Sequence, residues 1–166
     1  METALPTGVA VVRAMPNTPA LVGVGAAALC GGSAATADDI AWAKSILSSA
    51  GAVAEVGEHL LDAVTGLSGS GPAYIFLIAE AMTDAAVAMG LPRDVAALLT
   101  AQTIHGAGKM LTETGEEPVA LRAGVTTPAG TTAAGLAALE EHGVRAAFGA
   151  AVQAATDRSV ELGQAE

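Results

Sequence analysis

Aromatic side chains are scarce in this sequence. They make up 2% of its 166 residues, although 52% of the residues are hydrophobic. The apolar content is therefore mainly Ala, Val and Leu, and each of these small side chains buries little area. Such a composition excludes a core built on large rings. It favours helices that approach one another closely and an apolar surface that continues into a second copy of the chain, so we expect a homodimer or a higher assembly of dimers.

Positive charge is also scarce, with 7 Lys and Arg against 17 Asp and Glu and a net charge of −10. A field of this sign repels phosphate backbones, and no basic stripe offsets it, so nucleic acid is not an expected partner. An anionic small-molecule substrate has to be held by local groups instead. Helix N-termini, backbone N–H groups and hydroxyls can do this without a cationic side chain.

Cysteine occurs once, at position 30, which excludes an intramolecular disulfide and a cysteine metal cluster. The histidines at 59, 105 and 142 lack metal-ligand spacing, so no metal site is expected. Mean hydropathy is +0.51, yet Gly, Glu, Asp or Pro interrupts every apolar stretch well before the ~20 residues of a membrane span. No basic region precedes an apolar run at the N-terminus, so no signal peptide is predicted. We expect a soluble cytoplasmic protein that makes no membrane contact.

Residues 1–58 have the pattern of the end of an α/β domain. Short β-branched or apolar runs predict strands, a 3.6-residue apolar period ended by Gly51 predicts a helix, and two prolines predict a rigid, non-helical turn. The predicted order is strand 8–13, turn 14–19, strand 21–30, helix 38–49 and strand 52–56.

Residues 59–166 have helical periodicity almost throughout. The predicted helices are 72–89, 92–112, 131–141 and 144–162, with a short turn after Pro118. The fold class is therefore mostly α, with a partial Rossmann-like α/β remnant of strands and one helix ahead of an all-helical domain. The change in character near Gly57 to Leu60 places the domain boundary between residues 58 and 59.

The segment 125–132 (VTTPAGTT) is the strongest candidate for chemistry. It puts four threonine hydroxyls around Pro128 and Gly130 at a predicted helix N-terminus. A plain N-cap needs only one hydroxyl. The surplus favours a carboxylate site, where hydroxyls, unpaired N–H groups and the positive end of the helix act together.

Two other segments are open to alternative interpretations. Residues 68–72 (SGSGP) open a predicted helix, either to present N–H groups to an anion or, as we favour, to allow close backbone packing. The turn 15–19 (MPNTP) follows a strand's carboxyl end, where α/β proteins bind ligands. Asn17 there either contacts a cofactor or holds the turn together. Glu80 and Asp84, one helical turn apart, are interpreted as a solvated stripe rather than a carboxylate pair.

Taken together and in order, several stretches resemble pyrroline-5-carboxylate reductases. The matching stretches are VVRAMPNTPALVGVG (11–25), LDAVTGLSGSGPAYIF (61–76), MGLPR (89–93), QTIHGAGKML (102–111), LRAGVTTPAGTT (121–132) and DRSVEL (157–162). The resemblance implies NAD(P)H-dependent reduction of 1-pyrroline-5-carboxylate to L-proline. It also implies a Rossmann-like domain followed by a helical domain that interlocks with a second subunit.

By this resemblance, Thr127 and the backbone of Gly130 and Thr131 hold the substrate carboxylate, and the hydroxyl of Thr132 lies beside the imine nitrogen as the catalytic group. From their place at a strand's carboxyl end, rather than from the resemblance, Met15, Pro16 and Asn17 would contact the cofactor. The family's usual serine-proline-glycine-glycine is Thr127-Pro128-Ala129-Gly130 in this sequence, and alanine is less permissive than glycine at the third position.

The family's glycine-rich cofactor loop does not occur within these 166 residues, since neither GxGxxG nor GxxxxGK[ST] is present. We therefore expect the NADPH (or NADH) loop to be missing from this chain, and the chain to have little activity alone. One alternative is a non-catalytic helical dimerisation module that retains the carboxylate pocket. Another is a β-hydroxyacid-type dehydrogenase, but residues 72–89 lack the lysine typical of that class.

Overall fold

A computed structural model describes residues 2–164, which pack into two compact units. The first unit, the α/β unit, runs to Ala73 and includes the chain from Gly149 onward. The second, the helical unit, is Tyr74–Phe148. The mainly helical fold class with a small α/β part is confirmed. The two units are defined by which residues pack together. The domain boundary between residues 58 and 59 stays a prediction.

The α/β unit contains one three-stranded sheet in the order β1-β2-β3. Strands β1 (Val12–Pro16) and β2 (Gly25–Gly31) are antiparallel, and β2 is parallel to β3 (Gly51–Glu55). The parallel pair requires a crossover, which α1 (Ala37–Leu47) provides. A reciprocal capping box between Thr36 and Asp39 starts this helix.

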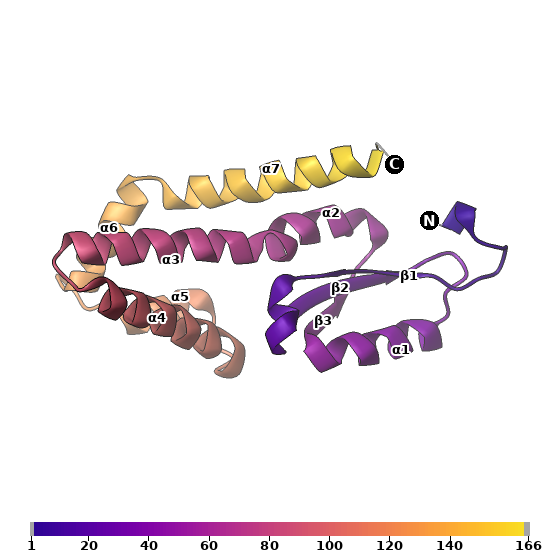
Figure 1. Ribbon diagram of the computed structural model, residues 1–166, viewed down its shortest axis with the longest axis horizontal. Helices are drawn as coiled ribbons and strands as arrows, with labels where there is room; N and C mark the ends of the chain where they lie inside the picture. The colour runs from indigo at the N-terminus through magenta and orange to yellow at the C-terminus, as the bar shows by residue number, and fades with distance from the viewer. Residues whose placement is uncertain (1, 165–166) are drawn as a thin grey trace. The chain divides into compact units, whose positions relative to one another are not determined.

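Both faces of β2 are covered (Figure 1). Leu29 is fully buried, and the neighbouring Gly31 faces Ile40 of α1. On the opposite face, Ala28 and Cys30 pack against Leu61 of α2 (Leu61–Val64). Since side chains alternate along a strand, this central strand is apolar on both faces.

A polar cluster ties the sheet to the 3-10 helix Glu58–Leu60 that precedes α2. Arg13 of β1 donates to Glu58, and Cys30 Sγ donates to Glu58 Oε2 at 2.8 Å. Burial, with the Glu58 carboxylate adding to it, raises the pKa of Cys30 to about 11. The hydrogen bond from Cys30, assisted by Arg13, lowers the pKa of Glu58. Cys30 is thus a protonated structural donor rather than a reactive thiolate.

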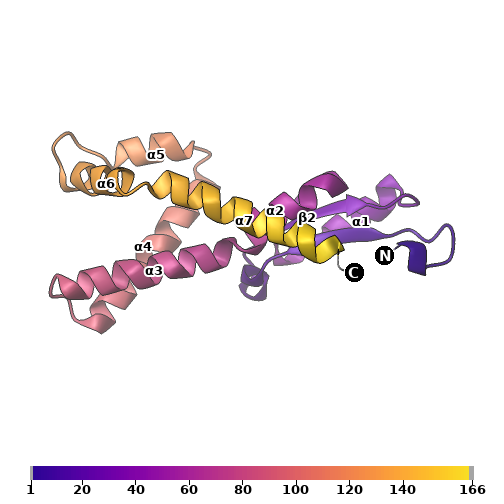
Figure 2. The ribbon, with the colours of Figure 1, turned by 90° about the horizontal axis from the view of Figure 1, so that it is seen from above.

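The rest of the chain is helical (Figures 1 and 2). After α2 come a π-helical turn (Thr65–Gly69), α3 (Gly71–Ala88), α4 (Arg93–Glu113), α5 (Pro118–Gly124), α6 (Thr131–Glu141) and α7 (Val144–Gln164). Left-handed glycines close three of these helices: Gly90 after α3 with φ of 101°, and Gly115 after α4 and Gly143 after α6, each with φ of 71°. No described helix is long and apolar enough to cross a bilayer.

The helix predictions are confirmed to within a few residues, but several other local predictions are wrong. The first strand is Val12–Pro16 rather than 8–13, because Gly8 has φ of 88° and the register with β2 extends to Pro16. The second starts at Gly25, since Thr18–Val22 forms a 3-10 helix with proline in its first turn. This 3-10 helix also contradicts the prediction of a non-helical turn over residues 14–19. The turn after Pro118 is α5, with proline again at a helix start.

Candidate functional site

Helix α6 begins without a side-chain cap. Its N-cap, Gly130, is extended (φ −79°, ψ 171°), and no side chain bonds to the first helical amides. The first backbone bond of the helix is donated by Ala134 to the Gly130 carbonyl at 3.2 Å. The N–H groups of Thr131 and Thr132 precede it and point along the positive end of the helix. These two backbone N–H groups can therefore donate hydrogen bonds to an anion.

The four threonine hydroxyls of this segment divide into two groups. Thr126 Oγ1 donates to the Arg122 carbonyl at 2.6 Å, so it belongs to the end of α5. Thr127 is exposed, and the turn that follows it is closed by the Gly130 N–H donating to the Thr127 carbonyl at 3.0 Å. The turn thereby places Thr127, Gly130, Thr131 and Thr132 at one end of α6. A Cβ on Gly130 would overlap Thr127 Oγ1, so a side chain at this position would force the Thr127 hydroxyl to move.

Ala129 has φ of 57° and is the one non-glycine residue with positive φ in the described chain. Left-handed backbone costs an L-residue roughly 1–2 kcal/mol. The third position of the Thr127–Gly130 turn, where the resemblance implies glycine, is therefore strained in this chain.

We expect Ala129→Gly to relieve this strain and to stabilise the chain by about 0.5 kcal/mol, the gain being reduced by the greater freedom of glycine in the unfolded state. Urea unfolding followed by circular dichroism measures it. Ala133→Gly inside α6 is the control and should destabilise by about 1 kcal/mol. A loss of stability in Ala129→Gly would contradict the strain.

The residues predicted to contact a cofactor lie at the carboxyl end of β1, in the α/β unit. The Asn17 amide is engaged on both sides, accepting from Ala26 N–H at 2.9 Å and donating to the Ser68 carbonyl at 3.0 Å. These bonds support the interpretation that Asn17 holds the turn. Met15 packs on the core cluster of the unit, and Pro16 borders a small cavity of about 60 Å³ with apolar lining side chains.

Residues 68–72 do not form a free helix N-terminus. The π-helical turn continues α2 towards α3, and the Ser70 N–H donates to the Thr65 carbonyl at 2.8 Å. The alternative of close packing holds at Gly69 and at Gly66 just before the segment, but not at Gly71, where a Cβ would meet nothing within 4 Å. A Cβ on Gly66 would overlap Thr156 Oγ1, and one on Gly69 would lie 2.6 Å from Met15 Cε. Sequence reasoning missed the π-helical turn, for which the pair of glycines three residues apart was the available signal.

Glu80 and Asp84 on α3 do not form a carboxylate pair. Asp84 instead forms an ion pair with Arg93 at the start of α4. Arg93 Nη2 lies 2.8 Å from Asp84 Oδ1, and both side chains are about two-thirds exposed. With Glu80 they border an open groove of about 400 Å³ between the two helices. Within the described residues, no three His, Cys, Asp or Glu side chains are arranged to hold a metal ion.

Comparison with known proteins identifies relatives over nearly the whole chain. The family model described as pyrroline-5-carboxylate reductase dimerisation matches residues 58–162. Pyrroline-5-carboxylate reductase of Corynebacterium melassecola is 50% identical over 99% of this chain and 61% of its own length. That of Methanosarcina acetivorans is 52% identical over 98% and 60%. The chain thus spans about 60% of the length of the curated relatives it matches.

Solved structures agree. The pyrroline-5-carboxylate reductase of Coxiella burnetii superposes with a TM-score of 0.94 at 43% identity, covering 97% of this chain and 60% of that one. The Plasmodium falciparum enzyme, solved with NADP bound, has a TM-score of 0.86 at 34% identity, covering 95% and 64%. Sequence and structure lead to one conclusion: this chain belongs to the pyrroline-5-carboxylate reductase family.

Proposed function

We propose that this chain forms the carboxylate pocket and the self-association surface of an enzyme that reduces 1-pyrroline-5-carboxylate to L-proline with NADPH or NADH. The observation that carries the proposal is the uncapped N-terminus of α6, surrounded by threonine hydroxyls. The start of the matched family model at residue 58 supports a substrate-binding and dimerisation domain from residue 59 onward.

The substrate carboxylate is held at the start of α6. Thr127 supplies a hydroxyl, and the N–H groups of Thr131 and Thr132 supply backbone donors. The Gly130 amide is already bonded to Thr127, so the role of Gly130 is to let the turn close. These local dipoles attract an anion despite the net charge of −10.

Reduction of the imine needs a hydride at the carbon of C=N and a proton at the nitrogen. A bound nicotinamide cofactor supplies the hydride; the carboxyl end of β1, where Met15 and Pro16 lie, is the edge at which α/β folds bind such groups. Thr132, half-buried at the start of α6, hydrogen-bonds the imine nitrogen and orients it. A threonine hydroxyl is a very weak acid, so the proton that reaches the imine nitrogen comes from water through Thr132, and the hydroxyl is not left deprotonated.

Replacing Thr132 by valine in the full-length enzyme is expected to lower kcat by about tenfold to a hundredfold, because the isosteric side chain keeps its volume and loses the hydroxyl. Cofactor oxidation in the presence of 1-pyrroline-5-carboxylate measures it. Thr126→Val is the matched control, since that hydroxyl is bonded to the Arg122 carbonyl, and it should retain kcat. Unchanged kinetics in Thr132→Val would remove Thr132 from the mechanism.

We further propose that the 166-residue polypeptide alone turns over slowly, because no glycine-rich phosphate loop occurs within it. Turnover close to that of the full-length relatives would contradict this. A non-catalytic module is the second candidate, and ligand binding separates the two. Proline or a cyclic carboxylate analogue should protect the amides of 127–132 from hydrogen exchange if the pocket is retained.

A further inference from the structure

The turn between β1 and β2 is bonded to a distant helical segment. Asn17 lies one residue beyond the end of β1, and its side chain is half-buried. Its Oδ1 accepts from the N–H of Ala26 in β2, and its Nδ2 donates to the carbonyl of Ser68, 51 residues away in the π-helical turn Thr65–Gly69. One side chain therefore connects two strands of the sheet with this turn.

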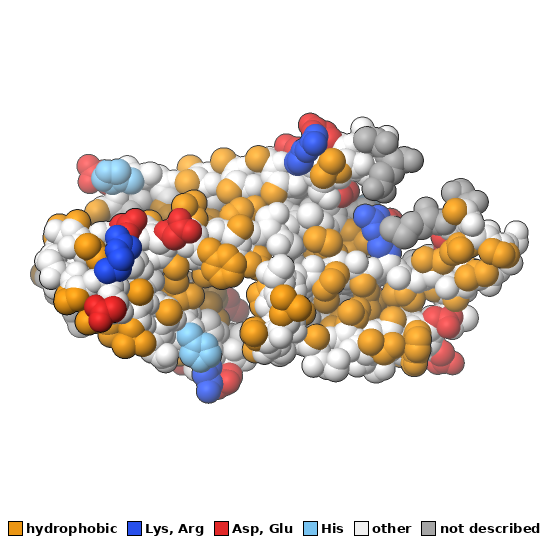
Figure 3. Space-filling view, viewed as in Figure 1, with side chains coloured by type: hydrophobic (Ala, Val, Ile, Leu, Met, Phe, Trp, Pro, Cys, Tyr) orange, Lys and Arg blue, Asp and Glu red, His pale blue; other side chains and the backbone are white. Residues whose placement is uncertain are grey.

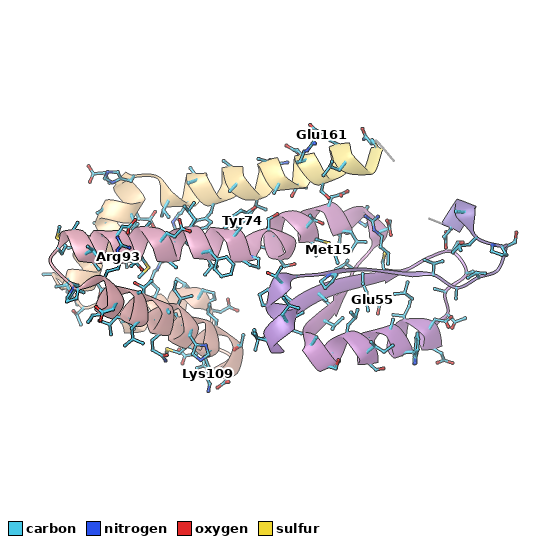
Figure 4. All side chains as sticks on the ribbon, in the orientation of Figure 1. Met15, Glu55, Tyr74, Arg93, Lys109 and Glu161 are labelled. Atoms are coloured by element: carbon cyan, nitrogen blue, oxygen red, sulfur yellow. The ribbon has the colours of Figure 1, made fainter. Side chains whose placement is uncertain are left out.

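The π-helical turn has contacts on two sides within the α/β unit. On the sheet side, Met15 Cε approaches Gly69, and Figure 4 shows Met15 on the side of the sheet that carries α2. On the other side, the Val152 carbonyl lies 2.7 Å from the position that a Cβ on Gly66 would take. These van der Waals contacts set the spacing of the turn from its neighbours, but they are not directional. The hydrogen bond from Asn17 Nδ2 to the Ser68 carbonyl is, by contrast, a directional link between the turn and the end of β1.

The position of this link matters because β1 ends at Pro16, and its carboxyl end is the edge where α/β proteins bind their ligands. A π-helical turn inside a helix is uncommon and occurs most often at functional sites. Both polar groups of the Asn17 side chain already have partners in the chain, which favours an indirect role over contact with a ligand.

We propose that Asn17 is a positioning residue, which holds the π-helical turn Thr65–Gly69 in register with the carboxyl end of β1 for the reaction. This inference rests on the proposed reductase function. It assigns Asn17 to the geometry of the site rather than to cofactor affinity. Misplacement of a site by about 1 Å can cost a hundredfold in rate, so the loss of one directional bond is enough to be seen in kcat.

The test uses the full-length enzyme with Asn17→Asp. Aspartate keeps an acceptor for Ala26 but sets a charged oxygen against the Ser68 carbonyl, so it replaces the hydrogen bond to the turn with a repulsion. Ser159→Ala is the matched control, since it removes a hydrogen bond from the opposite side of the same helical region, Ser159 Oγ to Asp62 Oδ1 at 2.6 Å. Turnover, KM, cofactor affinity by fluorescence, melting temperature and amide exchange are measured for both variants.

We expect Asn17→Asp to lower kcat by about tenfold or more with cofactor affinity within about twofold of the wild type, and to speed exchange of the Ser70 amide, which is bonded inside the turn. Ser159→Ala should keep kcat at a similar loss of melting temperature. Equal kcat in the two variants, or weakened cofactor binding with kcat intact, would overturn the proposal. If the wild-type enzyme does not reduce the imine, the reductase function fails, and unchanged Ser70 exchange in Asn17→Asp would separately refute the anchoring.

Discussion

Replacing Gly51 by alanine is expected to destabilise the chain by more than about 3 kcal/mol, or to prevent the α/β unit from folding. Gly51 begins β3 with φ of 150° and ψ of −159°, a conformation essentially confined to glycine. A Cβ there would overlap the carbonyl of Gly25, its partner in β2. Neither group can move aside, because both belong to the parallel ladder.

Urea unfolding followed by circular dichroism measures the loss, and amide exchange in β2 and β3 locates it. Gly149→Ala is the control, since the same substitution in α7 meets no atom within 4 Å. It should stabilise the chain by about 0.5–1 kcal/mol, because alanine favours the helix. A Gly51→Ala protein as stable as the wild type would show that β3 pairs differently.

Leu98→Arg is expected to weaken self-association by about a hundredfold or more. The helical unit leaves many large apolar side chains exposed, including Leu77 at 66%, Leu98 at 69% and Met89 at 84%. Figure 3 shows patches of hydrophobic side chains on the visible surface of this unit, between scattered charged groups. Monomeric proteins seldom expose so much apolar area, which supports a homodimer formed through these helices.

Arginine is chosen because it reduces the net charge of −10 and so lowers the general repulsion between copies. Weaker association must then come from the lost apolar contact. Light scattering with size-exclusion chromatography over a range of concentrations measures it. Trp42→Arg in α1 is the control, because this side chain is 70% exposed in the α/β unit. Dissociation by Trp42→Arg alone would move the interface to that unit.

The helices were predicted well because their signals are local. Apolar spacing and closing glycines placed the ends of 131–141 without error and those of the other helices within a few residues. The strands were predicted less well, since pairing decides where a strand starts and ends. Pairing with β2 extends β1 to Pro16, although the local sequence predicts that the strand ends before this proline.

The candidate site shows the same division. The cluster of threonines before α6 could be found from composition and position, because hydroxyls beside a helix start are visible in the sequence. That Thr126 turns back to the Arg122 carbonyl, and that Asn17 reaches Ser68, depends on side-chain directions set by packing.

The sequence by itself determined the family and the helical content, and it predicted the segment that we propose binds the carboxylate, because each follows from residue types at short spacing. Only the tertiary structure decided the extent of the strands, the π-helical turn and the partners of Asn17. These features arise from contacts between residues far apart in the chain, and the free energy of such contacts outweighs local preference.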